Sequence, residues 1–198
     1  MKIYETEPET ITVDGRIYRY KAPFDTVLFV LDVLRNGQML TKDRQALCFG
    51  LLFGRRLMSA EKKEKLLRAV MDELNSESGT PDGKPPCMSF AQDADLIRAA
   101  FLQQYHMDLD LQRGRMSWRR FLLLLSGLTE ATEFVQVVHL RTRPVPQANK
   151  HNYQERMDLI AAKQRVALKP ETTGGQERFA MQLGAMFDAL KAKAGERE

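Results

Sequence analysis

Residues 116–128, MSWRRFLLLLSGL, decide the fold class because their large apolar side chains recur at helical intervals. These side chains are three or four positions apart, which places them on one face of an α-helix. A helix with such a face is stable only when the face packs against other elements. The face consists of Trp118, Phe121, Leu125 and Leu128.

The segments on either side of this stretch have the same period. Residues 95–105, DLIRAAFLQQY, precede it, and residues 131–138 follow it with an apolar face of their own. Three successive helices with apolar faces indicate a helical core. The faces of the outer two helices include Ile97, Phe101, Tyr105 and Phe134.

The N-terminal part combines a hairpin with further helices. Asp14-Gly15 lies between two runs rich in β-branched and aromatic residues, which predicts a two-residue turn and a short hairpin packed on another element. From Pro23 the period becomes helical, with one helix ending near Asn36-Gly37. A second helix over 41–54 is apolar nearly all round in its second half, so we expect it to be buried at the centre.

The predicted fold is therefore mainly α. We expect a compact helical domain of about six helices, with a short N-terminal β-hairpin and a C-terminal amphipathic helix. The expected segments are a hairpin segment (1–22), a helical core domain (23–141) with a flexible loop at 75–89, and a C-terminal helical extension (142–198).

Composition excludes several classes of protein. The 198 residues are 43% hydrophobic and 28% charged, which is an ordinary globular composition. Two cysteines and three histidines are too few for a disulfide framework or a zinc cage. A net charge of +4 is too small to define a nucleic-acid-binding protein.

The chain is expected in a reducing cytoplasm. Its first residues, MKIYE, lack the apolar region of a secretory signal. The longest uninterrupted apolar runs, 27–31 and 121–125, are far shorter than the roughly 20 residues that span a bilayer. No association with a membrane is expected.

Motifs that resemble active sites have simpler explanations. Residues 79–84 have three positions between their glycines where a phosphate-binding loop needs four. Ser59 and Lys62 have the spacing of a nucleophile and its base, but a helix cap followed by solvated charges explains them better. Asp93 and Asp95 suit a helix start, where negative charge is favourable.

The remaining titratable residues do not form a site either. Asp108 and Asp110 fit a solvated connecting segment, and the histidines lie in three separate segments without metal-ligand spacing. We therefore expect no catalytic, metal or cofactor-binding residues, and a protein that is not an enzyme.

The two central segments carry a resemblance to a known family. An acid opens a helix with spaced Ile97, Phe101 and Tyr105, Met107-Asp108-Leu109 follows, and then comes the Trp118 block and a helix that ends at Arg141. This order resembles small proteins of siphophages from Gram-positive hosts, encoded between the major tail protein and the tape measure protein. The resemblance covers residues 10–170, and residues 171–198 fall outside it.

The resemblance implies a tail assembly chaperone that coats the helical tape measure protein in the host cell cytoplasm. Its implied partners are that protein and also the tail-tube protein. Two alternatives remain: a structural virion component such as a connector or tail-completion protein, and, less favoured, a nucleic-acid-binding protein. The residues of the family motif are expected in the core: Ile97, Phe101, Tyr105, Trp118, Phe121, Leu125, Leu128, Phe134 and Arg141.

The C-terminal region offers the contact candidates. Tyr153, Met157 and Ile160 continue at helical spacing, and Pro170 ends that pattern. A further amphipathic stretch follows Gly174-Gly175, and docking on its own domain or pairing with a second copy is the alternative to partner binding. Its candidate partner-binding residues are Phe179, Leu183, Met186, Phe187 and Leu190.

Overall fold

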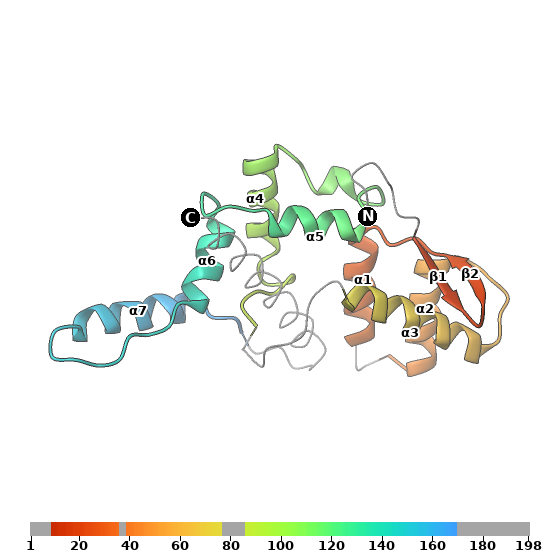
Figure 1. Cartoon of the computed structure of the whole chain (residues 1–198), viewed down its shortest axis with the longest axis horizontal. Coiled ribbons are helices and arrows are strands. Elements are labelled where there is room, and N and C mark those ends of the chain that lie inside the picture. The colour runs from red at the N-terminus through yellow and green to blue at the C-terminus, as the bar shows by residue number, and fades with distance from the viewer. Residues whose placement is uncertain (1–8, 36–38, 77–85, 170–198) are drawn as a thin grey trace. The chain divides into compact units, whose positions relative to one another are not determined.

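The computed structural model describes residues 9–35, 39–76 and 86–169, and this part of the chain is mainly helical (Figure 1). The predicted fold class is confirmed, whereas the expected C-terminal amphipathic helix lies outside the described residues. The elements are β1 (Thr10–Val13), β2 (Arg16–Arg19), α1 (Phe24–Arg35), α2 (Thr41–Phe53), α3 (Ala60–Ser76), α4 (Ala94–Tyr105), the short 3-10 helix η1 (Asp110–Gln112), α5 (Trp118–Ser126), α6 (Glu133–Thr142) and α7 (Tyr153–Arg165).

The chain forms two compact units. Unit 1 consists of residues 1–80 and 112–122, and unit 2 consists of residues 81–111 and 123–198. The expected segments 1–22, 23–141 and 142–198 stay predictions. The return of residues 112–122 to the N-terminal unit was not predicted from the sequence.

The predicted hairpin is confirmed. Strands β1 and β2 pair antiparallel, with Val13 opposite Arg16. Asp14 and Gly15 have φ of 50° and 73°, the positive values that a type I′ turn requires at both central positions. The hairpin rests on α3, where the Lys62 ammonium lies 2.7 Å from the Asp14 carboxylate and 5.5 Å from the centre of the Tyr18 ring. This exposed ion pair lowers the pKa of Asp14 and raises the pKa of Lys62.

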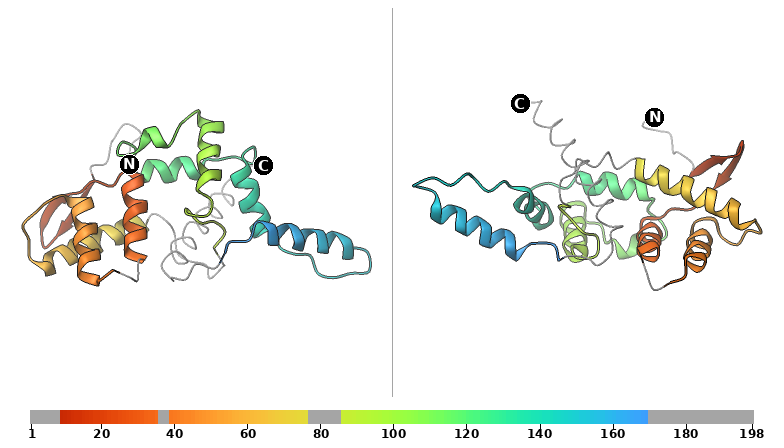
Figure 2. Two further views of the ribbon diagram at one scale, coloured as in Figure 1. Left: turned by 180° about the vertical axis from the view of Figure 1, so that it is seen from behind. Right: turned by 90° about the horizontal axis from the view of Figure 1, so that it is seen from below.

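The helices of unit 1 pack on one side of α2. In the right view of Figure 2, α1 and α2 are seen nearly end-on and α3 crosses them. The expectation that this helix is buried at the centre holds for one face of α2 only, because Gly50 is exposed and Leu47 is 38% exposed. Its neighbours α1 and α3 cover only the face that contains Cys48, Phe49, Leu52 and Phe53.

Residues 112–122 join unit 1 through both backbone and rings. The Trp118 amide donates to the Ala22 carbonyl (2.9 Å), and the Phe24 amide donates to the Met116 carbonyl (3.0 Å). The Phe121 ring stacks on the rings of Phe24 and Trp118, with centroids 4.9 and 5.6 Å away. The start of α5 is thereby tied to the start of α1.

Unit 2 has its own apolar centre. Phe101, Leu125 and Phe134 are at most 1% exposed, and they come from α4, α5 and α6. Tyr105 is half-buried, and its hydroxyl donates to the Leu124 carbonyl (2.8 Å). Burial raises the pKa of the Tyr105 phenol. Helix α4 and the end of α5 are therefore joined by a hydrogen bond as well as by apolar packing.

Gly127 lies where α4 and the end of α5 pack too closely for a side chain. A Cβ at Gly127 would lie 2.9 Å from the Tyr105 hydroxyl oxygen, whereas a Cβ at Gly50 in α2 would meet no atom within 4 Å. Gly127→Ala should lower the free energy of unfolding by about 1–3 kcal/mol through overpacking. Gly50→Ala should raise it by about 0.5–1 kcal/mol through helix propensity. Urea denaturation measures both changes, and a Gly127→Ala variant at least as stable as the wild type would contradict the packing at Gly127.

The two cysteines of the chain are buried thiols. Neither Cys48 nor Cys87 forms a disulfide, and burial raises the pKa of the Cys48 thiol to about 11. Within residues 9–35, 39–76 and 86–169, no helix has both the length and the apolar character needed to cross a membrane.

Candidate functional site

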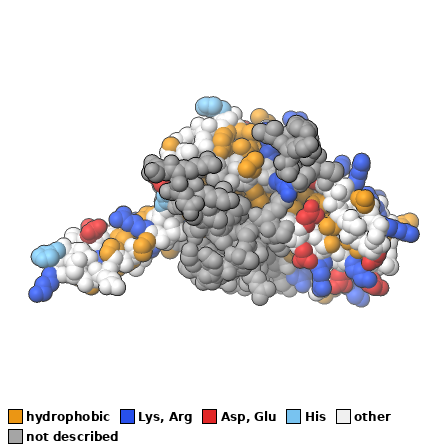
Figure 3. Space-filling view, in the orientation of Figure 1, with side chains coloured by type: hydrophobic (Ala, Val, Ile, Leu, Met, Phe, Trp, Pro, Cys, Tyr) orange, Lys and Arg blue, Asp and Glu red, His pale blue; other side chains and the backbone are white. Residues whose placement is uncertain are grey.

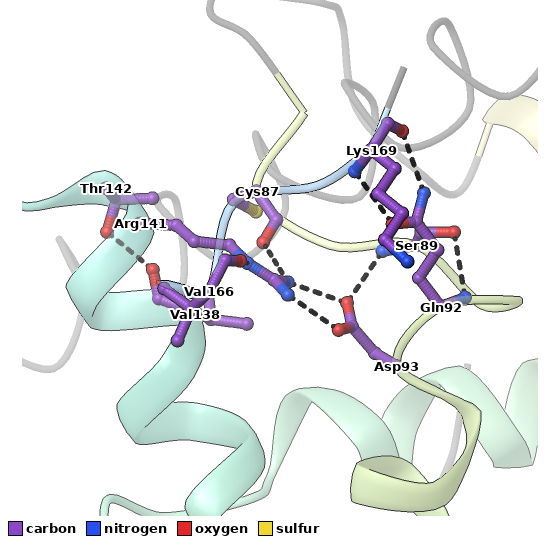
Figure 4. Close-up of polar contacts among 9 residues, drawn as sticks. All are labelled: Cys87, Ser89, Gln92, Asp93, Val138, Arg141, Thr142, Val166 and Lys169. Atoms are coloured by element: carbon purple, nitrogen blue, oxygen red, sulfur yellow. Dashed lines mark hydrogen bonds and ion pairs between the residues drawn. The ribbon is translucent and has the colours of Figure 1, made fainter. Parts of the chain in front are cut away.

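A buried ion pair between Asp93 and Arg141 organises the polar part of unit 2 (Figure 4). The Arg141 guanidinium donates to both carboxylate oxygens of Asp93, at 2.7 and 2.8 Å. The Asp93 side chain is 2% exposed and the Arg141 side chain 11%. The Asp93 carboxylate also accepts the Ser89 amide (2.8 Å), so the charge is compensated by three hydrogen bonds.

The same guanidinium fixes two other segments. It donates to the carbonyl of Cys87 (3.1 Å) and to the carbonyl of Val166, one residue beyond α7 (2.6 Å). Arg141 is in α6, and Asp93 immediately precedes α4. The Arg141 side chain therefore joins α6 to the residues before α4 and to the residues after α7.

Lys163 and Gln92 strengthen the attachment of α7. The Lys163 ammonium donates to the carbonyls of Leu140, Arg141 and Arg143 at the end of α6, at 3.2, 2.6 and 2.6 Å. A cation there satisfies carbonyls that have no partner within the helix. The Gln92 side-chain amide accepts the Lys169 amide (2.8 Å) and donates to the Lys169 carbonyl (3.0 Å). Together with Arg141, these side chains hold the C-terminal half of α7 and the residues after it.

Helix α7 nevertheless leaves much of its apolar surface uncovered. Leu159 is buried, but Tyr153 is 70% exposed and Met157 45% exposed. Ile160 is half-buried. Tyr153, Met157 and Ile160 occupy positions i, i+4 and i+7, so they share one face of the helix. We call these three residues the α7 stripe.

The α7 stripe is placed on an arm of unit 2. Residues 143–152 and α7 extend away from α6 in Figure 1, and hydrophobic side chains are visible along this arm in Figure 3. Two hydrogen bonds hold residues 143–152 against the start of α7. The Asn152 side chain donates to the Gln147 carbonyl (2.9 Å), and the Arg156 guanidinium donates to the Pro146 carbonyl. The arm therefore has a defined conformation of its own.

The residues of the expected family motif are distributed over both units. Trp118 and Phe121 are buried in unit 1, and the apolar members assigned to unit 2 are buried there, apart from the half-buried Tyr105. Arg141 forms the ion pair with Asp93 instead of packing among apolar side chains. The candidate partner-binding residues of the C-terminal stretch lie outside the described residues: Phe179, Leu183, Met186, Phe187 and Leu190.

The two acidic pairs, Asp93 with Asp95 and Asp108 with Asp110, have partners within the protein. Asp93 pairs with Arg141, while Asp95 and Asp110 lie 3.5 and 3.7 Å from the Arg98 guanidinium. Asp108 accepts the Asp110 amide (2.8 Å). In the part of the chain that the structure describes, no three His, Cys, Asp or Glu side chains lie close enough together to hold a metal ion.

Comparison with known proteins identifies a family. A family model described as Bacteriophage Gp15 protein matches residues 4–168. The chain belongs to this bacteriophage family. Membership in the Gp15 family indicates a phage protein of a structural or morphogenetic kind. Neither the curated proteins nor the solved structures give a significant match.

The Gp15 family match ends close to the point where the described chain ends. It includes the Asp93–Arg141 pair and all of α7, and it stops before residues 170–198. The sequence indicates a helix with Tyr153, Met157 and Ile160 on one face, but not that the face is open. It also singles out Asp93 and Arg141 separately, without the ion pair that joins them.

Proposed function

We propose that this Gp15-family protein is a non-enzymatic tail assembly chaperone that binds the helical tape measure protein in the host cell cytoplasm. The observation that supports the proposal is the α7 stripe, in which the exposed Tyr153 and Met157 and the half-buried Ile160 share one face of a well-anchored helix. Membership of a bacteriophage family supplies the biological setting. We infer the partner, the tape measure protein, from the resemblance of the motif to tail assembly chaperones.

The α7 stripe has the spacing that helix recognition uses. Amphipathic helices bind one another through apolar anchors at i, i+3 or i+4, and i+7. Burying an exposed apolar side chain of this size contributes about 1.5–3 kcal/mol before the cost of association. A few such anchors favour moderate, reversible binding, which suits a protein that tail-tube subunits must displace.

The test is co-expression with the tape measure protein of the same phage. We expect the wild-type chain to increase the soluble fraction of that protein and to co-purify with it. Replacing Tyr153 and Met157 by glutamine should reduce the co-purified amount by at least about tenfold, because two of the three anchors are lost. The fold should be unaffected, because both side chains are exposed.

The matched control is the double variant Gln154→Ala and Asp158→Ala. These two polar residues are also exposed on α7, and the Gln154 side-chain amide donates to the Asp158 carboxylate (2.9 Å). The control should co-purify with the tape measure protein as the wild type does. Equal losses in both variants would contradict a role for the α7 stripe.

Purified virions separate the chaperone from a structural component. A chaperone is released during assembly, so mass spectrometry of purified particles should not find the chain. A stoichiometric amount in the particles would contradict the proposal and favour a connector or tail-completion protein.

A further inference from the structure

The chain itself contains a segment suited to cover the α7 stripe. Residues 170–198 follow Lys169 and lie outside both the described residues and the family match. Their sequence predicts an amphipathic helix over 179–190, in which the apolar side chains recur every three or four positions. We propose that this C-terminal segment docks on the α7 stripe and that a partner helix displaces it.

The place where the described chain ends favours this intramolecular contact. The Gln92 side chain holds both backbone polar groups of Lys169, four residues beyond the end of α7. The C-terminal segment therefore begins shortly after the C-terminal end of α7, and the residue to which it is attached, Lys169, belongs to the same unit as the α7 stripe. A segment tethered there has a much higher effective concentration than a free partner.

The lengths of the linker (170–178) and of the expected helix (179–190) also allow this contact with α7. Residues 170–178 can span up to about 30 Å when extended, which exceeds the length of α7, about 20 Å. A helix over 179–190 would be about 18 Å long, so it can run back along α7 in the antiparallel direction. In that direction the middle of the segment, near Met186, lies opposite Met157.

Charge favours the same pairing. Residues 142–169 carry six Lys+Arg (143, 150, 156, 163, 165, 169) and two acids (155, 158), a net charge of +4. Residues 170–198 carry four Lys+Arg (178, 191, 193, 197) and five acids (171, 177, 188, 196, 198), a net charge of −1. A second copy of residues 142–169 would bring two segments of charge +4 together, so the C-terminal segment is the better occupant.

Cross-linking in the full chain tests the contact. Cysteines placed by Met157→Cys and Met186→Cys should form an intramolecular disulfide under mild oxidation, because docking brings their Cα atoms within about 7 Å. The matched control carries Glu155→Cys with Met186→Cys, on the opposite side of α7, and should react at least about tenfold more slowly. Cys48 and Cys87 are buried and do not compete. Cross-linked dimers that increase with protein concentration, or equal rates in test and control, would overturn the proposal.

A second measurement does not depend on the register of the two helices. The thiol introduced by Met157→Cys should react with a maleimide several-fold faster once Phe179→Gln and Phe187→Gln make the segment polar. An unchanged rate would overturn the docking.

The displacement step rests on the proposed function, whereas the docking step does not. Added tape measure protein should lower the yield of the disulfide between positions 157 and 186 without lowering the stability of the fold. If the disulfide forms but the tape measure protein does not co-purify, the docking is supported and the chaperone role is contradicted. If the tape measure protein co-purifies but no disulfide forms, the chaperone role is supported and the docking is contradicted.

Discussion

Replacing Arg141 by methionine should lower the free energy of unfolding by about 3–5 kcal/mol, the loss expected when one partner of a buried ion pair is removed. The Asp93 side chain is 2% exposed, so its carboxylate would stay buried with the Ser89 amide in place and the guanidinium gone. Methionine preserves much of the apolar stem of arginine, which separates the loss of charge from a loss of volume. Urea denaturation, followed by circular dichroism, measures the change.

The matched control for this prediction is Arg98→Met. The Arg98 side chain is 48% exposed and faces Asp95 and Asp110 at 3.5 and 3.7 Å, so its loss should cost less than about 1 kcal/mol. Combining Arg141→Met with Asp93→Leu should recover part of the lost stability, because no unpaired buried charge remains. A double variant no more stable than Arg141→Met would mean that the hydrogen bonds to Cys87 and Val166 are what matters.

Features set by neighbouring residues could be predicted from the sequence. The hairpin was predictable because Asp14 and Gly15 tolerate positive φ and the strands flank them directly. The start of α1 at Phe24 was predictable because Pro23 precedes it and the period changes there. In each case the decisive interaction lies within a few residues along the chain.

Features that depend on distant pairing could not be predicted. Periodicity identified the apolar face of α5, but not that the Trp118 amide bonds to Ala22, far away along the chain. It gave α2 and α7 apolar faces without saying how much of each face its neighbours cover. A helical period reports which side chains share a face, whereas the tertiary contacts decide whether that face is buried. The open α7 stripe is therefore a finding of the structure.

The second large effect is expected at Trp118. Its side chain is 1% exposed and stacks on Phe121, whose ring stacks on Phe24. Trp118→Ala should lower the free energy of unfolding by about 3–5 kcal/mol, through lost burial and the cavity left behind. The variant should also loosen the attachment of residues 112–122 to unit 1, because the indole anchors the first turn of α5. Urea denaturation measures the loss, and hydrogen exchange over 112–122 measures the loosening.

The same helix supplies the control that makes this prediction specific. Leu123 is also in α5, but it is 70% exposed, so Leu123→Ala should change the free energy of unfolding by less than about 0.5 kcal/mol. Both substitutions shorten a large side chain to alanine, a good helix former, so helix propensity cannot explain a difference between them. If Trp118→Ala cost no more than Leu123→Ala, the ring stack would not hold the start of α5 against α1. If Trp118→Ala were costly but exchange over 112–122 stayed slow, the backbone bonds at Ala22 and Met116 would be the main attachment.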